Sequence, residues 1–133
     1  MISKRLRNII ALSIPLFIIH GLDEYLSGFY NIDSHVAFMF GWLANMPNMQ
    51  ALFLLFQIML WFTLIVSYLL LLGGRWHQWL MFIPGVIYLY ELHHLYKVIE
   101  VDGYYPGILT AIPLYVVGFF FWKELIKNLR QQS

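Results

Sequence analysis

Two short stretches of the sequence combine histidine with carboxylate side chains at spacings that suit one face of a helix. The first stretch contains His20, Asp23 and Glu24, and the second contains Glu91 and His94. Side chains three and four residues apart share a helical face, so each stretch would present its imidazole and carboxylate groups together. Glu-x-x-His is also the spacing by which bundle helices present ligands to di-iron and di-manganese centres. These five residues are therefore the candidate catalytic residues.

A mixture of imidazole and carboxylate groups suits zinc, iron or manganese. We expect His20, Glu24, Glu91 and His94 to be ligands of such a divalent metal, while a remaining carboxylate handles protons for a bound water or substrate. Without a metal, a buried glutamate that keeps its proton would act as a general acid on an apolar substrate. The structural alternative is that these groups only pair with one another. This alternative is disfavoured, because each ionisable group costs about 2.5–3.5 kcal/mol if it lies inside a membrane.

The composition indicates that these groups lie inside a membrane protein. Hydrophobic residues make up 61% of the 133 residues and charged residues only 11%, and the mean hydropathy is +0.69. A soluble domain of this size could not bury that many apolar side chains. The net charge of +1 predicts no nucleic-acid-binding surface, and the absence of cysteine excludes thiol chemistry.

Four apolar runs are close to the length of a membrane span, roughly 20 residues. We expect a single transmembrane domain over residues 1–133, an all-α bundle of four transmembrane helices. The expected spans are approximately residues 8–28, 48–72, 79–99 and 107–122.

Two details of the connecting segments follow from local signals. The first outer loop contains SHVAFMFGWLA from Ser34, with Asp33 or Ser34 as a helix cap, which predicts a short interfacial or re-entrant helix. Pro106 is expected to be the first residue of the fourth helix.

The depths of the two stretches agree when each span is measured from its inner end at about 1.5 Å per residue. His20 then lies at roughly 18 Å and Glu24 at roughly 24 Å, while Glu91 and His94 lie at roughly 18 and 22 Å. Gln57 on the second span comes to a similar level. His93 points well away from Glu91, towards another helix or the headgroups.

Lysine and arginine residues define the orientation, because they gather on the cytoplasmic side of membrane proteins. The loop over residues 30–47 has none, and the third loop has only Lys97 at its edge. The others lie in both tails and the second loop: Lys4, Arg5, Arg7, Arg75, Lys123, Lys127 and Arg130. We expect an integral protein of the bacterial inner membrane with both termini cytoplasmic.

The stretch from His20 to Glu24, HGLDE, resembles the motif that names the HXXEE family of small membrane proteins. The sequence from Tyr105 to Gly107, followed by Thr110, Ala111 and Pro113, is similar to the later part of that family. The family pattern has a Glu-Glu pair, whereas Asp23 is the first acid here. The resemblance implies that His20, Glu24 and His94 are functional positions.

The leading hypothesis is a membrane enzyme that acts on a lipid or another hydrophobic small molecule. Its substrate pocket would include Gln57, Tyr90, Tyr105 and Thr110. One alternative is a proton-coupled transporter or channel-like oligomer, for which a chain this short would form a homodimer. A second alternative is a haem b anchor with His20 and His94 as axial ligands.

The span count and the charge distribution make the topology testable. Reporter fusions after Ser133 and within the first loop should lie on opposite sides of the membrane, because three spans, an odd number, separate the C-terminal tail from the first loop. If both reporters give the same side, the four-span topology is wrong.

Overall fold

The computed structural model describes residues 2–43, 45–73 and 77–131, and most of these residues are helical. The elements in chain order are α1 (Lys4–Leu26), η1 (Phe29–Asn31), α2 (Ser34–Phe40), η2 (Gly41–Leu43), α3 (Asn48–Leu71), α4 (His77–Leu80), α5 (Phe82–Tyr90), α6 (Leu92–Val101) and α7 (Ile108–Arg130). By length and composition, α1, α3 and α7 are apolar enough to cross a membrane. The predicted all-α class is therefore confirmed.

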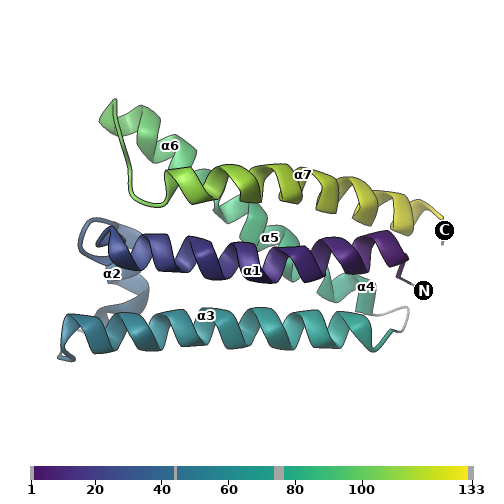
Figure 1. Ribbon diagram of the computed structural model, residues 1–133, viewed down its shortest axis with the longest axis horizontal. Helices are drawn as coiled ribbons and strands as arrows, with labels where there is room; N and C mark the ends of the chain where they lie inside the picture. Colours follow the sequence, from purple (N-terminus) through teal and green to yellow (C-terminus); the bar gives the residue numbers. More distant parts are fainter. Residues whose placement is uncertain (1, 44, 74–76, 132–133) are drawn as a thin grey trace.

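Helix α1 lies between α7 and α3, and α5 crosses behind it at an angle (Figure 1). The N-terminus and the C-terminus lie at the same end of the molecule (Figure 1). Helices α1 and α7 are antiparallel, because Arg5 pairs with Glu124 near the termini while His20 contacts Thr110 towards the other end.

One stripe of α1 faces the interior along its whole length. Its buried residues include Leu6, Ile10, Ser13, Phe17 and His20, at alternating spacings of four and three residues. This spacing places them on one side of the helix. The same stripe thus packs the core near the N-terminus and carries His20 into the interior further along.

Helix α7 packs against this stripe through Leu114, Phe121 and Leu125, which are fully buried. Gly118 lies on the same face and lets the ring of Tyr88 from α5 approach the backbone. A Cβ atom at this glycine would lie 2.8 Å from Tyr88 Cδ1, which is closer than real Cβ contacts. Small residues that permit such close approach are typical of helix packing inside membranes.

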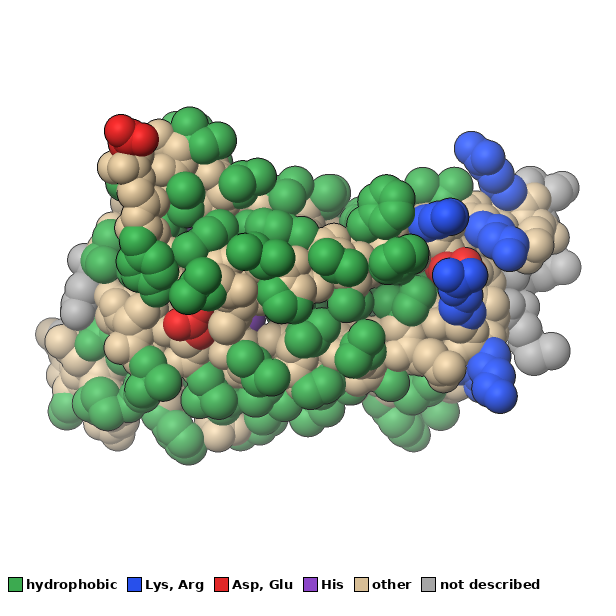
Figure 2. All heavy atoms as spheres, turned by 45° about the horizontal axis from the view of Figure 1, so that its top comes forward, with side chains coloured by type: hydrophobic (Ala, Val, Ile, Leu, Met, Phe, Trp, Pro, Cys, Tyr) green, Lys and Arg blue, Asp and Glu red, His purple; other side chains and the backbone are tan. Residues whose placement is uncertain are grey.

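The helix ends near the two termini are joined by polar contacts. Arg5 Nη1 lies 3.2 Å from Glu124 Oε1. The Ser3 backbone N–H donates to Asn128 Oδ1 at 3.0 Å, and Asn128 Nδ2 donates to Ser3 Oγ at 3.1 Å. Figure 2 shows the lysine and arginine side chains of the visible face gathered at this end, whereas most side chains on the rest of that face are apolar and a few are acidic. Arg75, used for the predicted orientation, lies outside the described residues.

The third expected span, residues 79–99, is divided among α4, α5 and α6 instead of forming one unbroken helix. Helix α5 begins at Phe82, and Pro84 lies in its first turn. Proline has no N–H to donate to the carbonyl of Leu80, so the helix is interrupted between α4 and α5. The second interruption, at Glu91, belongs to the candidate site.

The two predictions for connecting segments have different outcomes. The short helix in the first loop is confirmed as α2, with the Asp33 carboxylate accepting from the N–H groups of His35 and Val36. The prediction that Pro106 starts the fourth helix is wrong. Helix α7 begins at Ile108, because Gly107 adopts a left-handed conformation (φ 85°) and acts as its N-cap.

The close packing at Gly118 predicts that an added methyl group will destabilise the protein, which is the opposite of its usual effect in a helix. At an open helical position, glycine-to-alanine changes usually stabilise a protein by about 0.4–1 kcal/mol. Gly118→Ala should instead lower the free energy of unfolding by about 1–3 kcal/mol, because Tyr88 must move. Thermal unfolding in detergent measures the change. Gly41→Ala is the matched control, since no atom lies within 4 Å of its added Cβ. Equal melting temperatures for both variants would contradict the packing.

Candidate functional site

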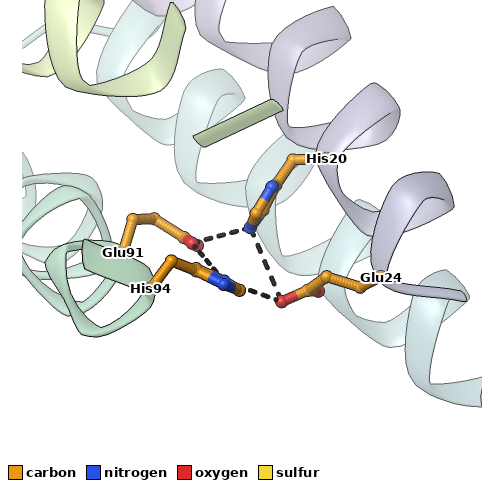
Figure 3. A group of neighbouring side chains, drawn as sticks. All are labelled: His20, Glu24, Glu91 and His94. Carbon is orange, nitrogen blue, oxygen red and sulfur yellow. Dashed lines mark ion pairs between the residues drawn. The ribbon is translucent and has the colours of Figure 1, made fainter. Parts of the chain in front are cut away.

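Four side chains that could each offer a metal-ligand atom meet where the last turns of α1 face the junction of α5 and α6 (Figure 3). They are His20, Glu24, Glu91 and His94. His20 Nε2 lies 2.7 Å from Glu91 Oε2 and 3.5 Å from Glu24 Oε1. His94 Nε2 lies 3.2 Å from Glu24 Oε1 and 3.5 Å from Glu91 Oε2. The predicted proximity of the two sequence stretches is confirmed.

Each of the two imidazole rings is fixed through its Nδ1 atom. His94 Nδ1 lies 2.8 Å from the Pro106 carbonyl, which can only accept, so this nitrogen carries the proton. His20 Nδ1 lies 2.9 Å from Thr110 Oγ1, and that hydroxyl donates to Asp23 Oδ2 at 2.7 Å. The His20 Nδ1–H therefore donates to the threonine. In the neutral rings both Nε2 lone pairs face the two glutamates.

This arrangement is the one that metal-binding histidines show, with one ring nitrogen donating to an outer partner and the other free to bind. His20 Nε2 is buried and has no hydrogen-bond partner among the described residues. Glu91 Oε2 is the carboxylate oxygen nearest to this nitrogen, at 2.7 Å.

The spacing of the four ligand atoms also fits a divalent ion. Nitrogen and oxygen ligands about 2.0–2.1 Å from a tetrahedral zinc ion are about 3.3 Å from one another. The four imidazole–carboxylate distances of 2.7–3.5 Å bracket that value. Two carboxylates would also balance the charge of a divalent cation. The residues present thus fit a metal, and His20, Glu24, Glu91 and His94 could hold it.

The same geometry argues against a haem between the two histidines. The rings of His20 and His94 are in edge-to-face contact, with centroids 4.9 Å apart. Axial ligands must lie on opposite faces of a porphyrin. The glutamate side chains already occupy the space that both Nε2 atoms face.

Glu91 lies at the interruption between α5 and α6. Its backbone remains in the helical region, with φ −60° and ψ −20°. The His94 N–H bonds to the Glu91 carbonyl at 3.2 Å, in the tighter i to i+3 pattern of a 3₁₀ turn. The Tyr115 hydroxyl of α7 donates to the same carbonyl at 2.9 Å. This second donor stabilises the local tightening, which brings Glu91 and His94 to the same side.

Three consecutive residues of the loop before α7 make contacts in or beside the site. The Tyr105 hydroxyl donates to Asp33, and the Pro106 carbonyl accepts from His94. Gly107 lies against both imidazoles, because a Cβ atom there would be 2.6 Å from His94 Cε1 and 3.2 Å from His20 Cε1. Each residue of the Tyr-Pro-Gly sequence therefore makes its own distinct contact.

A second polar group, the outer cluster of Asp33, His35, His93 and Tyr105, joins the first loop to α6. The sequence did not predict it as a site. Asp33 Oδ2 lies 2.6 Å from His93 Nε2 and accepts from the Tyr105 hydroxyl at 2.9 Å. Burial by itself raises the pKa of Asp33, but hydrogen bonds from His93 and Tyr105 outweigh it and hold the pKa below its ordinary value. The sequence did contain a signal for this cluster. His93 directly precedes His94, so on a helix its side chain points about 100° away from that of His94.

Asp33, His35 and His93 are also close enough to hold a cation. However, the Asp33 carboxylate already accepts four hydrogen bonds, from His93, Tyr105 and the N–H groups of His35 and Val36. We therefore assign this cluster to anchoring the first loop.

A cavity of about 480 Å³ lies next to the four-residue group. Glu24 and Glu91 line it, whereas His20 and His94 lie behind them. Its other walls are mostly aromatic and aliphatic side chains of α1, α2, α3 and α5. This volume is within the range of about 300–1,000 Å³ that is typical of small-molecule sites.

The remaining predicted site residues lie at different distances from this centre. Tyr90 lines the cavity, whereas Gln57 does not. Thr110 contacts the His20 ring and donates to Asp23, so neither Thr110 nor Asp23 converges on the glutamates. Tyr105 packs on His94, with ring centroids 6.0 Å apart, and belongs to the outer cluster.

Comparison with known proteins places these features in a family. Residues 11–122 match the family described as protein of unknown function with HXXEE motif. The matched region includes both histidine–carboxylate stretches and the loop before α7. No curated protein and no solved structure matches the chain.

The contact of Gly107 with both imidazoles predicts that an added methyl group will disturb the site. In Gly107→Ala the new Cβ displaces His94, and alanine is strained at φ 85°. Diethyl pyrocarbonate should then modify His20 and His94, which are buried in the wild type. Mass spectrometry measures the extent of modification. Gly103→Ala, whose Cβ meets nothing closer than 3.8 Å, should leave both protected. Protection of both rings in Gly107→Ala would contradict the geometry.

Proposed function

We propose that this chain, which belongs to the HXXEE-motif family, is an integral membrane enzyme that acts on a hydrophobic small molecule through a metal held by His20, Glu24, Glu91 and His94. The observation that carries the proposal is the pair of Nδ1-anchored imidazoles whose Nε2 atoms face two carboxylates at the end of an apolar cavity. Anchored histidines of this kind are the usual support of a bound metal.

The proposed topology has four spans, with α4, α5 and α6 together forming the third. The path from His77 to Val101 is about 25 residues long, or roughly 37 Å at helical rise, which is enough to cross a hydrocarbon core of about 30 Å. An even number of spans agrees with termini at the same end of the molecule (Figure 1). Lysine and arginine at that end favour a cytoplasmic location for both termini.

The four residues have different roles in the proposed reaction. A bound divalent metal would supply a Lewis acid that polarises a substrate oxygen or activates a water. His20 and His94 are fixed by their outer hydrogen bonds and orient the centre. Glu24 and Glu91 line the cavity and meet the substrate, so either can take a proton from a group bound there. The apolar walls keep bulk water away.

The metal is the part of the proposal that is simplest to test. Protein purified in mild detergent should contain a bound divalent metal, and elemental analysis should identify it as zinc, iron or manganese. His94→Ala and Glu91→Gln should each lose most of that metal, because each removes one of four ligands. His35→Ala and Glu100→Gln are matched controls outside the group and should retain it.

Thermal stability measured on the same samples separates a metal site from a packing network. Removing one partner of a buried charge pair typically costs about 3–5 kcal/mol. A metal-free wild type, together with early melting of both site variants, would replace the enzyme proposal with a purely structural role. Loss of metal with little change in the melting temperature of the metal-free proteins supports the proposal.

A further inference from the structure

The cavity beside the glutamates has a mouth that can be located from exposure. Most residues that line it are buried or half-buried. The exposed ones are Met39 of α2, Phe62 of α3 and Tyr90 of α5, at 48%, 46% and 47%. Three elements thus border the opening, which lies between α3 and α5 beneath the short helix α2.

The surface around this mouth is apolar. Trp61 and Ile65 are exposed beside it on α3, and Val86 and Leu89 are exposed on α5. An exposed apolar surface of this kind is favourable in contact with lipid hydrocarbon and unfavourable in contact with water. In the proposed topology the mouth therefore opens sideways into the bilayer, and a ligand reaches the glutamates without crossing the aqueous phase.

The polar groups of the cavity restrict the head group of that ligand. Glu24 and Glu91 are the carboxylates that line the cavity, and Tyr25, Tyr30 and Tyr90 also line it. None of the described residues lining the cavity is lysine or arginine. A phosphate or carboxylate head would therefore have no cationic side chain to pair with. Burying an unpaired charge in such surroundings is strongly unfavourable.

Charge balance leads to the same restriction from the metal side. Two glutamates neutralise one divalent ion, so an anionic head would leave a net negative charge in the cavity, and an ammonium head would be repelled by the ion. A hydroxyl or carbonyl oxygen adds no charge and can both bind an ion and hydrogen-bond to a carboxylate or tyrosine.

From these observations we infer that the cavity binds a lipid with an apolar chain and an uncharged hydroxyl or carbonyl head. The lipid enters from the membrane between α3 and α5, and its head lies against Glu24 and Glu91. This inference rests on the proposed metal-dependent function, since the bound ion excludes a cationic head.

The test uses three photoreactive probes that share one diazirine-bearing hexadecyl chain and differ only in the head group: an alcohol, a carboxylate and an amine. Metal-loaded protein in detergent is irradiated with each probe, and mass spectrometry locates the labels. The alcohol should label the cavity walls of α1 and α3 at least about tenfold more than the other two probes. A tenfold difference corresponds to roughly 1.4 kcal/mol, which is small beside the cost of burying an unpaired charge.

Two variants fill the cavity without touching the four-residue group. Thr63→Trp and Leu55→Trp each add a large ring to the α3 wall, and both should lose most of the alcohol labelling. Leu71→Trp is the matched control, since Leu71 is 52% exposed at the far end of the same helix and does not line the cavity, and it should label like the wild type. Leu55→Trp gives an independent reading if Thr63→Trp does not fold. Metal content is measured on each sample to show that the site is intact.

Each outcome has a defined consequence. Equal labelling by the carboxylate or the amine in metal-loaded protein overturns the uncharged head. Undiminished labelling in the folded tryptophan variants overturns the cavity as the binding place. A metal-loaded protein that the alcohol does not label overturns this inference and leaves the proposed metal site standing. Selective alcohol labelling of a protein that holds no metal supports the cavity assignment and overturns the proposed function.

Discussion

Each imidazole of the His20–His94 pair has one ring nitrogen fixed by a hydrogen bond to a residue near the start of α7, and the other nitrogen is thereby directed at two carboxylates. The rings cannot turn away without breaking these bonds. Buried carboxylates and imidazoles need compensation in an apolar bundle, because burial removes much of the water that would solvate them. The positions of Glu24 and Glu91 therefore depend on how the two rings are held.

Several irregular features of the backbone serve this one arrangement. The tightened turn at Glu91, which receives the Tyr115 hydroxyl, brings Glu91 and His94 to the same side. The left-handed conformation of Gly107 allows the loop before α7 to lie against both rings. Such local departures from regular helix occur in membrane proteins where protein groups take up the freed backbone donors and acceptors. Here the site side chains themselves are among those groups.

The outer cluster and the cavity give the two faces of the centre different properties. Asp33, hydrogen-bonded to His93 and Tyr105, ties the first loop to α6. The helix that follows Asp33 contributes Val36, Met39 and Phe40 to the cavity wall. Fixing Asp33 therefore also fixes one wall of the cavity. The other side chains that line the cavity are mostly apolar, so the carboxylates meet any bound molecule in surroundings of low polarity.

The sequence by itself determined the helical class, the two histidine–carboxylate stretches and their common depth, because hydrophobic run lengths and helical spacing are local properties. It also predicted the α2 helix from its Asp33 cap. Only the tertiary structure decided that Asp23 supports His20 through Thr110 while Glu24 faces His94. Adjacent acids on one helix differ by about 100° in direction, so the packed neighbours select which one enters the centre. The tightened turn at Glu91, the role of Gly107 and the cavity likewise depend on contacts between distant segments, which no local spacing encodes.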